Sequence, residues 1–162
     1  MKNILISILI LTSLSSYAQL CLEGKVVTDL SQLDVDAICE TKQQLYIEAK
    51  DTFDQVFSQI DMTNMEDQKL WALVLGPQQS YLVEKAQNDM NYCSDCSRDA
   101  HLFYKCGAYK DINQEATLSY KTEYLKLNLL DRADQIRWQE IEPALNAKVK
   151  SSSIAYRHCQ TT

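Results

Sequence analysis

Glycine, proline and histidine are scarce in this chain, which contains three Gly, two Pro and two His among 162 residues. Folds built from many strands need frequent tight turns, and Gly and Pro are the residues that favour such turns. No alternation of apolar and polar residues extends beyond the segment KVV at 25–27. The sequence therefore predicts an all-α protein.

Catalytic signatures are also missing. Only His101 and His158 could supply an imidazole base, and neither lies in a nucleophile motif such as G-x-S-x-G. No glycine-rich phosphate-binding loop occurs in the chain. We therefore predict no catalytic residue, no cofactor and no enzyme activity.

The only long apolar run is at the N-terminus, in MKNILISILILTSLSSYAQ. A Lys, an apolar core of about 11 residues and a Ser-Tyr-Ala ending are typical of a secretory signal peptide, here residues 1–18. The run is shorter than the roughly 20 residues that span a bilayer, and no second run follows. We expect a periplasmic or secreted protein without a membrane anchor after cleavage at Ala18.

All six cysteines follow that segment, and an even number in an exported protein predicts three disulfides. The sequence leaves all fifteen pairings open. Cleavage would leave 144 residues, which we expect to bury a true core that the disulfides only reinforce. The cysteines are Cys21, Cys39, Cys93, Cys96, Cys106 and Cys159.

One stretch, CSDCSRDAHLFYKC at 93–106, has the spacing C-x2-C-x4-H-x4-C of a zinc knuckle. A zinc site would use Cys93, Cys96, His101 and Cys106 and would leave an odd number of thiols in an oxidising compartment. The knuckle's glycines and interleaved basic and aromatic residues are also missing. Disulfides are therefore the main prediction, with a zinc-stabilised module or a small exported enzyme or redox protein as alternatives.

Helical periodicity organises the first half of the chain. Apolar residues recur at helical spacing over 35–61 and predict a long amphipathic helix. Thr63 and Glu66 have the spacing of a capping box and predict a second helix. Gly76 is expected to end that helix in a left-handed conformation, and Pro77 to begin the next.

The third helix should reach Cys93, and further helices are expected around 112–127 and on either side of Pro143. We detect no internal repeat and no linker in the sequence. The prediction is a single domain over 19–162, a small disulfide-reinforced bundle of about four to six helices.

Acidic residues outnumber basic ones. The chain has 22 Asp and Glu against 16 Lys and Arg, and loss of the signal segment with its one Lys makes the net charge −7. Such a protein is unsuited to nucleic acid and suited to a cationic protein partner. Tyrosines, which favour interfaces, gather in the second half. The candidate interface residues are Tyr104, Tyr109, Tyr120 and Tyr124.

Three segments suggest a family. An early Cys21 followed by DAICETKQQL (36–45), QQSYL (78–82) before a further Cys, and YRHC (156–159) together resemble the small exported lysozyme-inhibitor proteins of the LprI type. Tyr81 stands where those proteins have Trp. The resemblance implies an exported helical protein that binds a cationic cell-wall hydrolase. We therefore expect a non-catalytic inhibitor, or an immunity protein that neutralises a toxin of this kind.

Overall fold

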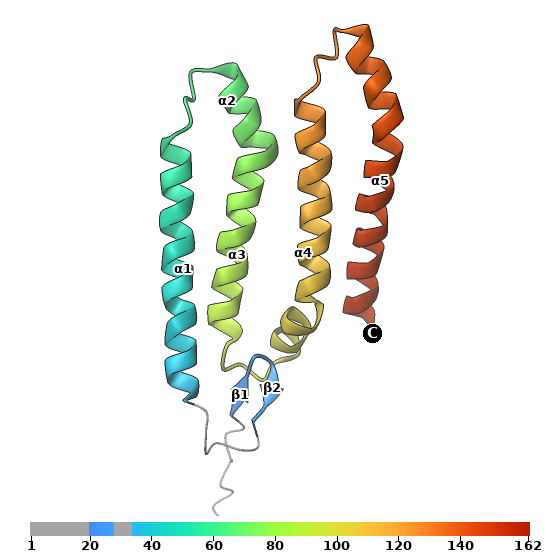
Figure 1. Ribbon diagram of the computed structural model, residues 1–162. Coiled ribbons are helices and arrows are strands. Elements are labelled where there is room, and N and C mark those ends of the chain that lie inside the picture. Colours follow the sequence, from blue (N-terminus) through green and yellow to red (C-terminus); the bar gives the residue numbers. More distant parts are fainter. Residues whose placement is uncertain (1–19, 28–33) are drawn as a thin grey trace, which may run out of the picture.

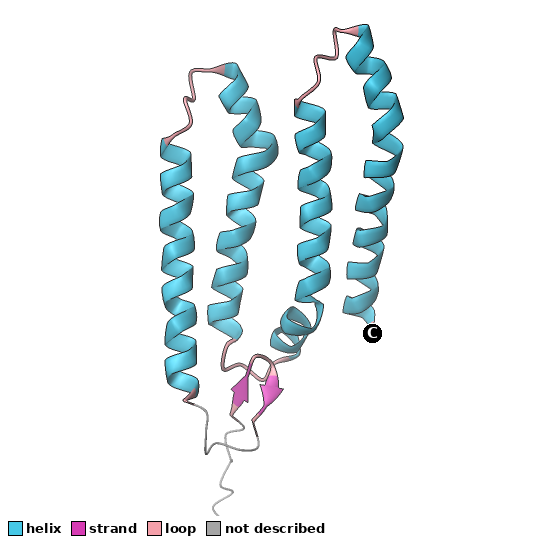
Figure 2. Cartoon of the chain, viewed as in Figure 1, coloured by secondary structure: helices cyan, strands magenta, loops and turns pink. Residues whose placement is uncertain are grey.

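The computed structural model describes residues 20–27 and 34–162, so the predicted signal peptide, 1–18, lies outside the described residues. Four long helical rods lie side by side in the order of the chain (Figure 1). A small antiparallel β-hairpin lies at their base (Figure 2). The elements are β1 (Cys21–Leu22), β2 (Lys25–Val26), α1 (Val35–Ser58), α2 (Met65–Leu70), the π-helix η1 (Trp71–Leu75), α3 (Gly76–Tyr92), α4 (Arg98–Leu125) and α5 (Arg132–Thr161).

The predicted all-α class is confirmed. The segments α2, η1 and α3 follow one another without a break and form a single rod, so the described residues contain four rods, the lower end of the expected range. The first and second rods pack together as one helical hairpin, and α4 and α5 as another. The contact between α3 and α4, which joins the two hairpins, is much smaller.

The two hairpins repeat one sequence pattern, so the prediction of no internal repeat is wrong. Each has a Cys, an aromatic residue after 13 intervening residues, a second aromatic after three more, and a Trp after another 13. A Cys follows the Trp after 21 intervening residues in the first hairpin and 20 in the second. The matching sets are Cys39, Phe53, Phe57, Trp71 and Cys93, and Cys106, Tyr120, Tyr124, Trp138 and Cys159.

The turns at the closed ends of the hairpins confirm the repeat in atomic detail. The Asp67 carboxylate accepts from the backbone N–H of residue 61 at 3.1 Å, and the Asp134 carboxylate from that of residue 128 at 2.7 Å. The Gln68 and Gln135 amides donate to backbone carbonyls six residues earlier, at 2.6 and 2.7 Å. Both turns therefore have the same local conformation.

The caps of the two returning helices also correspond. Asn64 caps α2 and Asp131 caps α5, each by accepting a backbone N–H two residues later. The predicted capping box is therefore misplaced by one residue, because Asn64 and not Thr63 supplies the cap. Thr63 instead donates its backbone N–H and hydroxyl to Asp61.

The π-helix contains the one-residue difference between the repeats. Five residues separate Trp71 from Pro77, but four separate Trp138 from Pro143. An extra residue in a helix is accommodated as a π-turn, in which an N–H bonds to the carbonyl five residues back. The Gly76 N–H makes this bond to the Trp71 carbonyl. The helix then continues in register, so the following Cys still faces its partner.

The expected left-handed cap at Gly76 is wrong. Its φ of −59° is that of a right-handed helix, which runs on through Pro77. Glycine suits this position for a steric reason, because a Cβ there would lie 2.8 Å from the Trp71 carbonyl oxygen and 3.1 Å from its ring. The absence of a side chain thus lets the Trp71 ring lie against the backbone of the π-turn.

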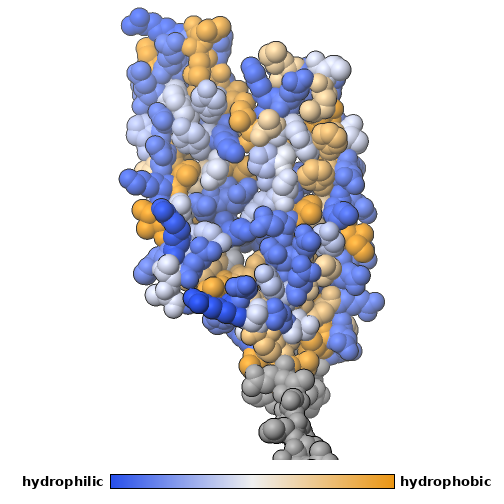
Figure 3. Space-filling view, turned by 180° about the vertical axis from the view of Figure 1, so that it is seen from behind, coloured by the Kyte–Doolittle hydropathy of each residue, from blue (hydrophilic) through white to orange (hydrophobic). Residues whose placement is uncertain are grey.

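The expectation of a true core is also wrong. Each described rod packs mainly against its neighbours in the row, so only a narrow strip of each helix is covered. Hydrophobic residues consequently reach the surface between hydrophilic ones (Figure 3). Among the described residues, the buried apolar side chains are Cys21, Val35, Val74, Cys93, Ala100, Cys106 and Cys159, and no large aliphatic or aromatic side chain is fully buried.

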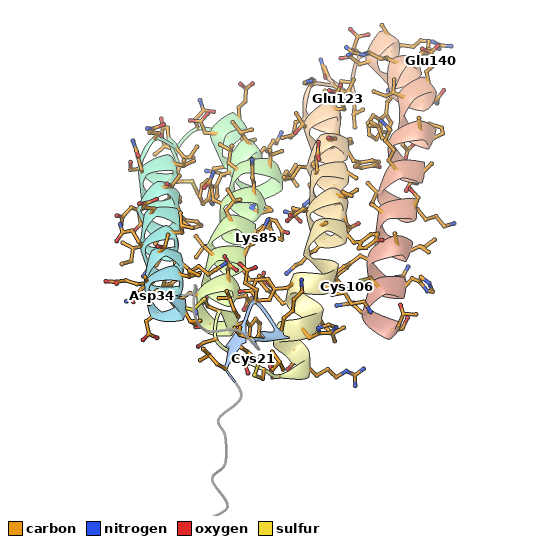
Figure 4. All side chains as sticks on the ribbon, turned by 60° about the horizontal axis from the view of Figure 1, so that its bottom comes forward. Cys21, Asp34, Lys85, Cys106, Glu123 and Glu140 are labelled. Atoms are coloured by element: carbon orange, nitrogen blue, oxygen red, sulfur yellow. A yellow bond between two sulfur atoms is a disulfide. The ribbon has the colours of Figure 1, made fainter. Side chains whose placement is uncertain are left out.

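The three predicted disulfides are present, and they take over much of the role of a core. Cys39–Cys93 joins α1 to the end of α3, and Cys106–Cys159 joins α4 to α5. Cys21–Cys96 fastens the β-hairpin to the loop between α3 and α4. All three lie toward the base of the molecule, opposite the turns that close the hairpins (Figures 1 and 4).

Candidate functional site

The residues of the zinc-knuckle spacing are not assembled into a site. Cys93, Cys96 and Cys106 belong to three different disulfides, so this structure offers no thiolate among them. The side chain of His101 is exposed, and its backbone supports the turn of the β-hairpin, where a Cβ on Gly24 would lie 2.8 Å from the His101 Cα. Within residues 20–27 and 34–162, no group of three or more His, Cys, Asp or Glu could hold a metal ion.

A charged network ties four elements together at the base. Lys42 on α1 is 13 % exposed and lies 2.8 Å from the Glu23 carboxylate and 2.9 Å from that of Asp89 on α3. Burial alone would lower the pKa of Lys42, but these two acids raise it above its usual value. Lys42 also lies over the ring of Tyr104 on α4, at 5.5 Å from its centre. This cation therefore holds the hairpins to each other.

A polar seam joins α3 to α4. The Lys85 ammonium lies 2.7 Å from Asp111, which also accepts the Tyr81 hydroxyl hydrogen, and Lys110 lies 2.9 Å from Glu84. Burial would raise the pKa of Asp111, but the hydrogen bonds from Lys85 and Tyr81 hold it below its usual value. The seam is thus an ion-pair contact and not an apolar interface.

An open groove of about 470 Å³ runs along the same seam. Leu82 on α3 and Leu118 on α4 line it, together with Asp111 and Glu115. No group in it has the arrangement of a nucleophile with a base. The groove is lined by both apolar and acidic side chains.

The four candidate tyrosines do not form one surface. The Tyr104 hydroxyl donates to the Asp89 carbonyl at 3.0 Å, so this residue belongs to the base network. Tyr120 and Tyr124 pack edge-on against Trp138, with ring centres 5.2 and 5.4 Å apart. Tyr109 lines an open groove between α4 and α5 and is 46 % exposed. Tyr104 and Tyr124 are about 30 Å apart along α4, at 1.5 Å per residue.

The acidic charge is concentrated in the first hairpin. Residues 34–92 contain eleven acidic and four basic side chains, whereas residues 98–161 contain eight acidic and ten basic. The net charge of the whole chain conceals this division. A count by segment would have revealed it from the sequence, but the exposure of these residues comes from the structure.

The outer face of α1 carries four of these eleven acids. The spacing of these residues places them on one side of the helix, and all are exposed, although Asp54 also lines a groove that α1 shares with α3. None forms an ion pair with another described residue, in contrast to the paired acids of the base and the seam. We name this face the acidic edge, and it consists of Asp36, Glu40, Ile47, Asp51 and Asp54.

The far end of the row has the opposite sign. No acidic residue follows Glu142, and Lys148, Lys150 and Arg157 on α5 are all exposed. Among the described residues, no helix is both long enough and apolar enough to span a membrane. The described residues therefore present two exposed charged faces of opposite sign. No family model, no curated protein and no solved structure matches the chain.

Proposed function

We propose that this protein is a non-catalytic exported binding protein that neutralises a cationic cell-wall hydrolase, as an inhibitor or as an immunity protein. The acidic edge is the observation that carries the proposal. Its four carboxylates have no basic partner among the described residues, and Ile47, 43 % exposed, lies among them. A face of this kind suits a basic protein surface, with an apolar contact at its centre.

Two further observations support the proposal. The three disulfides indicate an oxidising environment outside the cytoplasm, in which cell-wall hydrolases also act. The resemblance of the cysteine-bearing segments to LprI-type inhibitors points to the same class of partner. The compartment, periplasmic or secreted, is part of the proposal.

The test is surface plasmon resonance with the oxidised protein against a cationic lysozyme and, separately, a cationic cell-wall amidase. We expect binding to one of them with an association rate that falls as salt rises, because screening weakens steering between opposite charges. Asp51→Asn with Asp54→Asn should lower that rate by about three- to tenfold.

The matched control neutralises two exposed acids on other helices, Glu66→Gln with Glu140→Gln, and should retain the rate. Glu140 lies on α5 near the closed end of the second hairpin (Figure 4). Equal losses in both variants would show that only net charge matters and would remove the acidic edge from the proposal. Absence of binding to both hydrolases would contradict the proposed function.

A further inference from the structure

The first and last rods of the row each have a neighbour on one side only. Because the hairpins repeat, the seam between α3 and α4 shows how the second helix of one hairpin packs against the first helix of the next. Within residues 20–27 and 34–162, no further helix lies beyond α5 or before α1 in the row. The repeat therefore identifies which residues on the two ends occupy seam positions.

On α5, the seam positions are small or basic. The α3 residues that face α4 or pair with it include Tyr81, Leu82, Glu84 and Lys85. The repeat spacing, counted from Pro77 and Pro143, gives their counterparts, all of which are exposed. We name these positions the basic edge, which consists of Ala147, Lys148, Lys150 and Ser151; Lys148 and Ser151 also line the groove between α4 and α5.

On α1, the seam positions fall on and beside the acidic edge. The α4 residues Lys110, Asp111, Gln114 and Leu118 contact α3 or line the seam groove. Counted from the first Cys of each hairpin, their counterparts are exposed residues of α1. These counterparts are Gln43, Gln44, Ile47 and Asp51.

The two ends complement each other in charge at matched positions. Leu82 and Leu118 line the same groove in the seam, and their counterparts are Lys148 and Asp51. Glu84 pairs with Lys110 in the seam. Its counterpart Lys150 would lie near Gln43 and, one helical turn away, Glu40. Two leucines that line one groove inside the chain thus correspond to opposite charges at its ends.

We propose that the basic edge of one molecule binds the acidic edge of a second copy, in the geometry of the seam between α3 and α4. In Figure 1, α1 and α4 run upward and α3 and α5 downward, so a copy placed beside α5 would continue the antiparallel alternation. The contact joins two different faces and leaves both ends of the row open. It therefore builds chains and not closed dimers.

The contact is sensitive to salt, because it consists of exposed charges around a small apolar centre. Single exposed ion pairs contribute little, so several must act together and the association is weak. Sedimentation velocity of the oxidised protein over a range of concentrations should show an average mass that grows past the dimer at low salt. At ionic strength near 1 M, where the screening length is about 3 Å instead of about 10 Å at 0.1 M, the protein should be a monomer.

Charge reversal supplies the decisive measurement. Lys148→Glu with Lys150→Glu makes the matched positions acidic at both ends, and Glu40→Lys with Asp51→Lys makes those positions basic at both ends. Each variant alone should lose association by at least about tenfold, because like charges then face each other. An equimolar mixture of the two should recover association, because each edge again meets its opposite.

The matched control reverses two exposed cations away from the α5 edge, Lys25→Glu with Lys69→Glu, and should associate like the native chain. If the protein stays monomeric at all concentrations in low salt, the proposal is overturned. The charged edges would then act as polar caps that keep the ends of the row from associating. A plateau at the dimer, or a mixture that fails to associate, would overturn it as well.

Hydrolase binding distinguishes this inference from the proposed function. The variant Lys148→Glu with Lys150→Glu keeps the acidic edge intact and should still bind a cationic hydrolase. Loss of self-association with retained hydrolase binding supports both proposals. Self-association without hydrolase binding would support the proposed contact between two copies and would contradict the proposed function.

Discussion

The α1–α3 hairpin and the α4–α5 hairpin are closed by the same kinds of residue and carry opposite charge. Each has a disulfide at its open end and a Trp packed against two aromatic rings near its turn. The exposed positions differ, with a net negative charge on the first hairpin and a net positive one on the second. The two hairpins thus share the residue types that close them and differ in the residues at their surfaces.

The comparison also explains why so small a core suffices. A helical pair with one contact strip buries little apolar area, and each hairpin here is fastened at both ends instead. The seam adds ion pairs between Lys85 and Asp111 and between Lys110 and Glu84, which orient the hairpins without a dry interface. The fold is thus two fastened units in polar contact.

The largest effect we expect comes from the disulfides. Cys39–Cys93 and Cys106–Cys159 close loops of nearly equal length, with separations of 54 and 53 residues. Replacing either pair by Ser should therefore lower the free energy of unfolding by a similar amount, about 4 kcal/mol on the chain-entropy model. Urea denaturation followed by circular dichroism measures both. A loss below about 1 kcal/mol in either hairpin would show that packing, and not the cross-link, closes it.

An intermediate effect should follow deletion of Gly76. The deletion gives the first hairpin the Trp-to-Pro spacing of the second, so the π-turn should become an ordinary α-turn with Cys93 still facing Cys39. We expect a loss of about 1–2 kcal/mol and an intact disulfide, shown by thiol counting and denaturation.

The matched control for that deletion removes Ser80 from α3. It rotates every following residue by about 100° and should prevent the Cys39–Cys93 pairing. Equal tolerance of both deletions would contradict the correspondence between the hairpins. Free thiols after the Gly76 deletion would contradict it as well.

The smallest effect concerns the seam. The pKa of Asp111 in the folded protein lies below its usual value, so its contribution to stability is present above the unfolded pKa and is lost as pH falls through the folded one. Both partners are partly exposed, so we expect less than about 1 kcal/mol. Asp111→Asn should flatten the decline in stability below pH 4, measured by denaturation at several pH values. Glu140→Gln is the control and should leave that decline unchanged.

Much of the fold is readable from local patterns. The spacing of apolar residues predicts the long helix of α1, and the scarcity of Gly and Pro predicts an all-α protein. The even number of cysteines predicts three disulfides. The repeat was also present in the sequence, but it rests on a few positions at wide spacing. The extra residue before Pro77 shifts the later residues of the first hairpin by one position relative to the second hairpin. This shift conceals the repeat.

The candidate site was harder to predict. Tyr104, Tyr120 and Tyr124 are polar aromatics that suit an interface; in the structure Tyr104 bonds to the Asp89 carbonyl, and Tyr120 and Tyr124 pack against Trp138. The spacing of residues 93–106 suits zinc, but their partners lie far away in the chain, at Cys39, Cys21 and Cys159. Whether a side chain is exposed or a cysteine is paired depends on which residues lie near it in space. The sequence alone does not give those neighbours.

The sequence by itself determined the helices, their turns and the number of disulfides, because these depend on periodicity, caps and composition within short stretches of chain. Only the tertiary structure decided the pairing of the cysteines, the open row of rods and the position of the unpaired acids on the outer edge of α1. The physical reason is that a helix has several faces of similar composition. Which of them is covered depends on contacts between segments more than 50 residues apart.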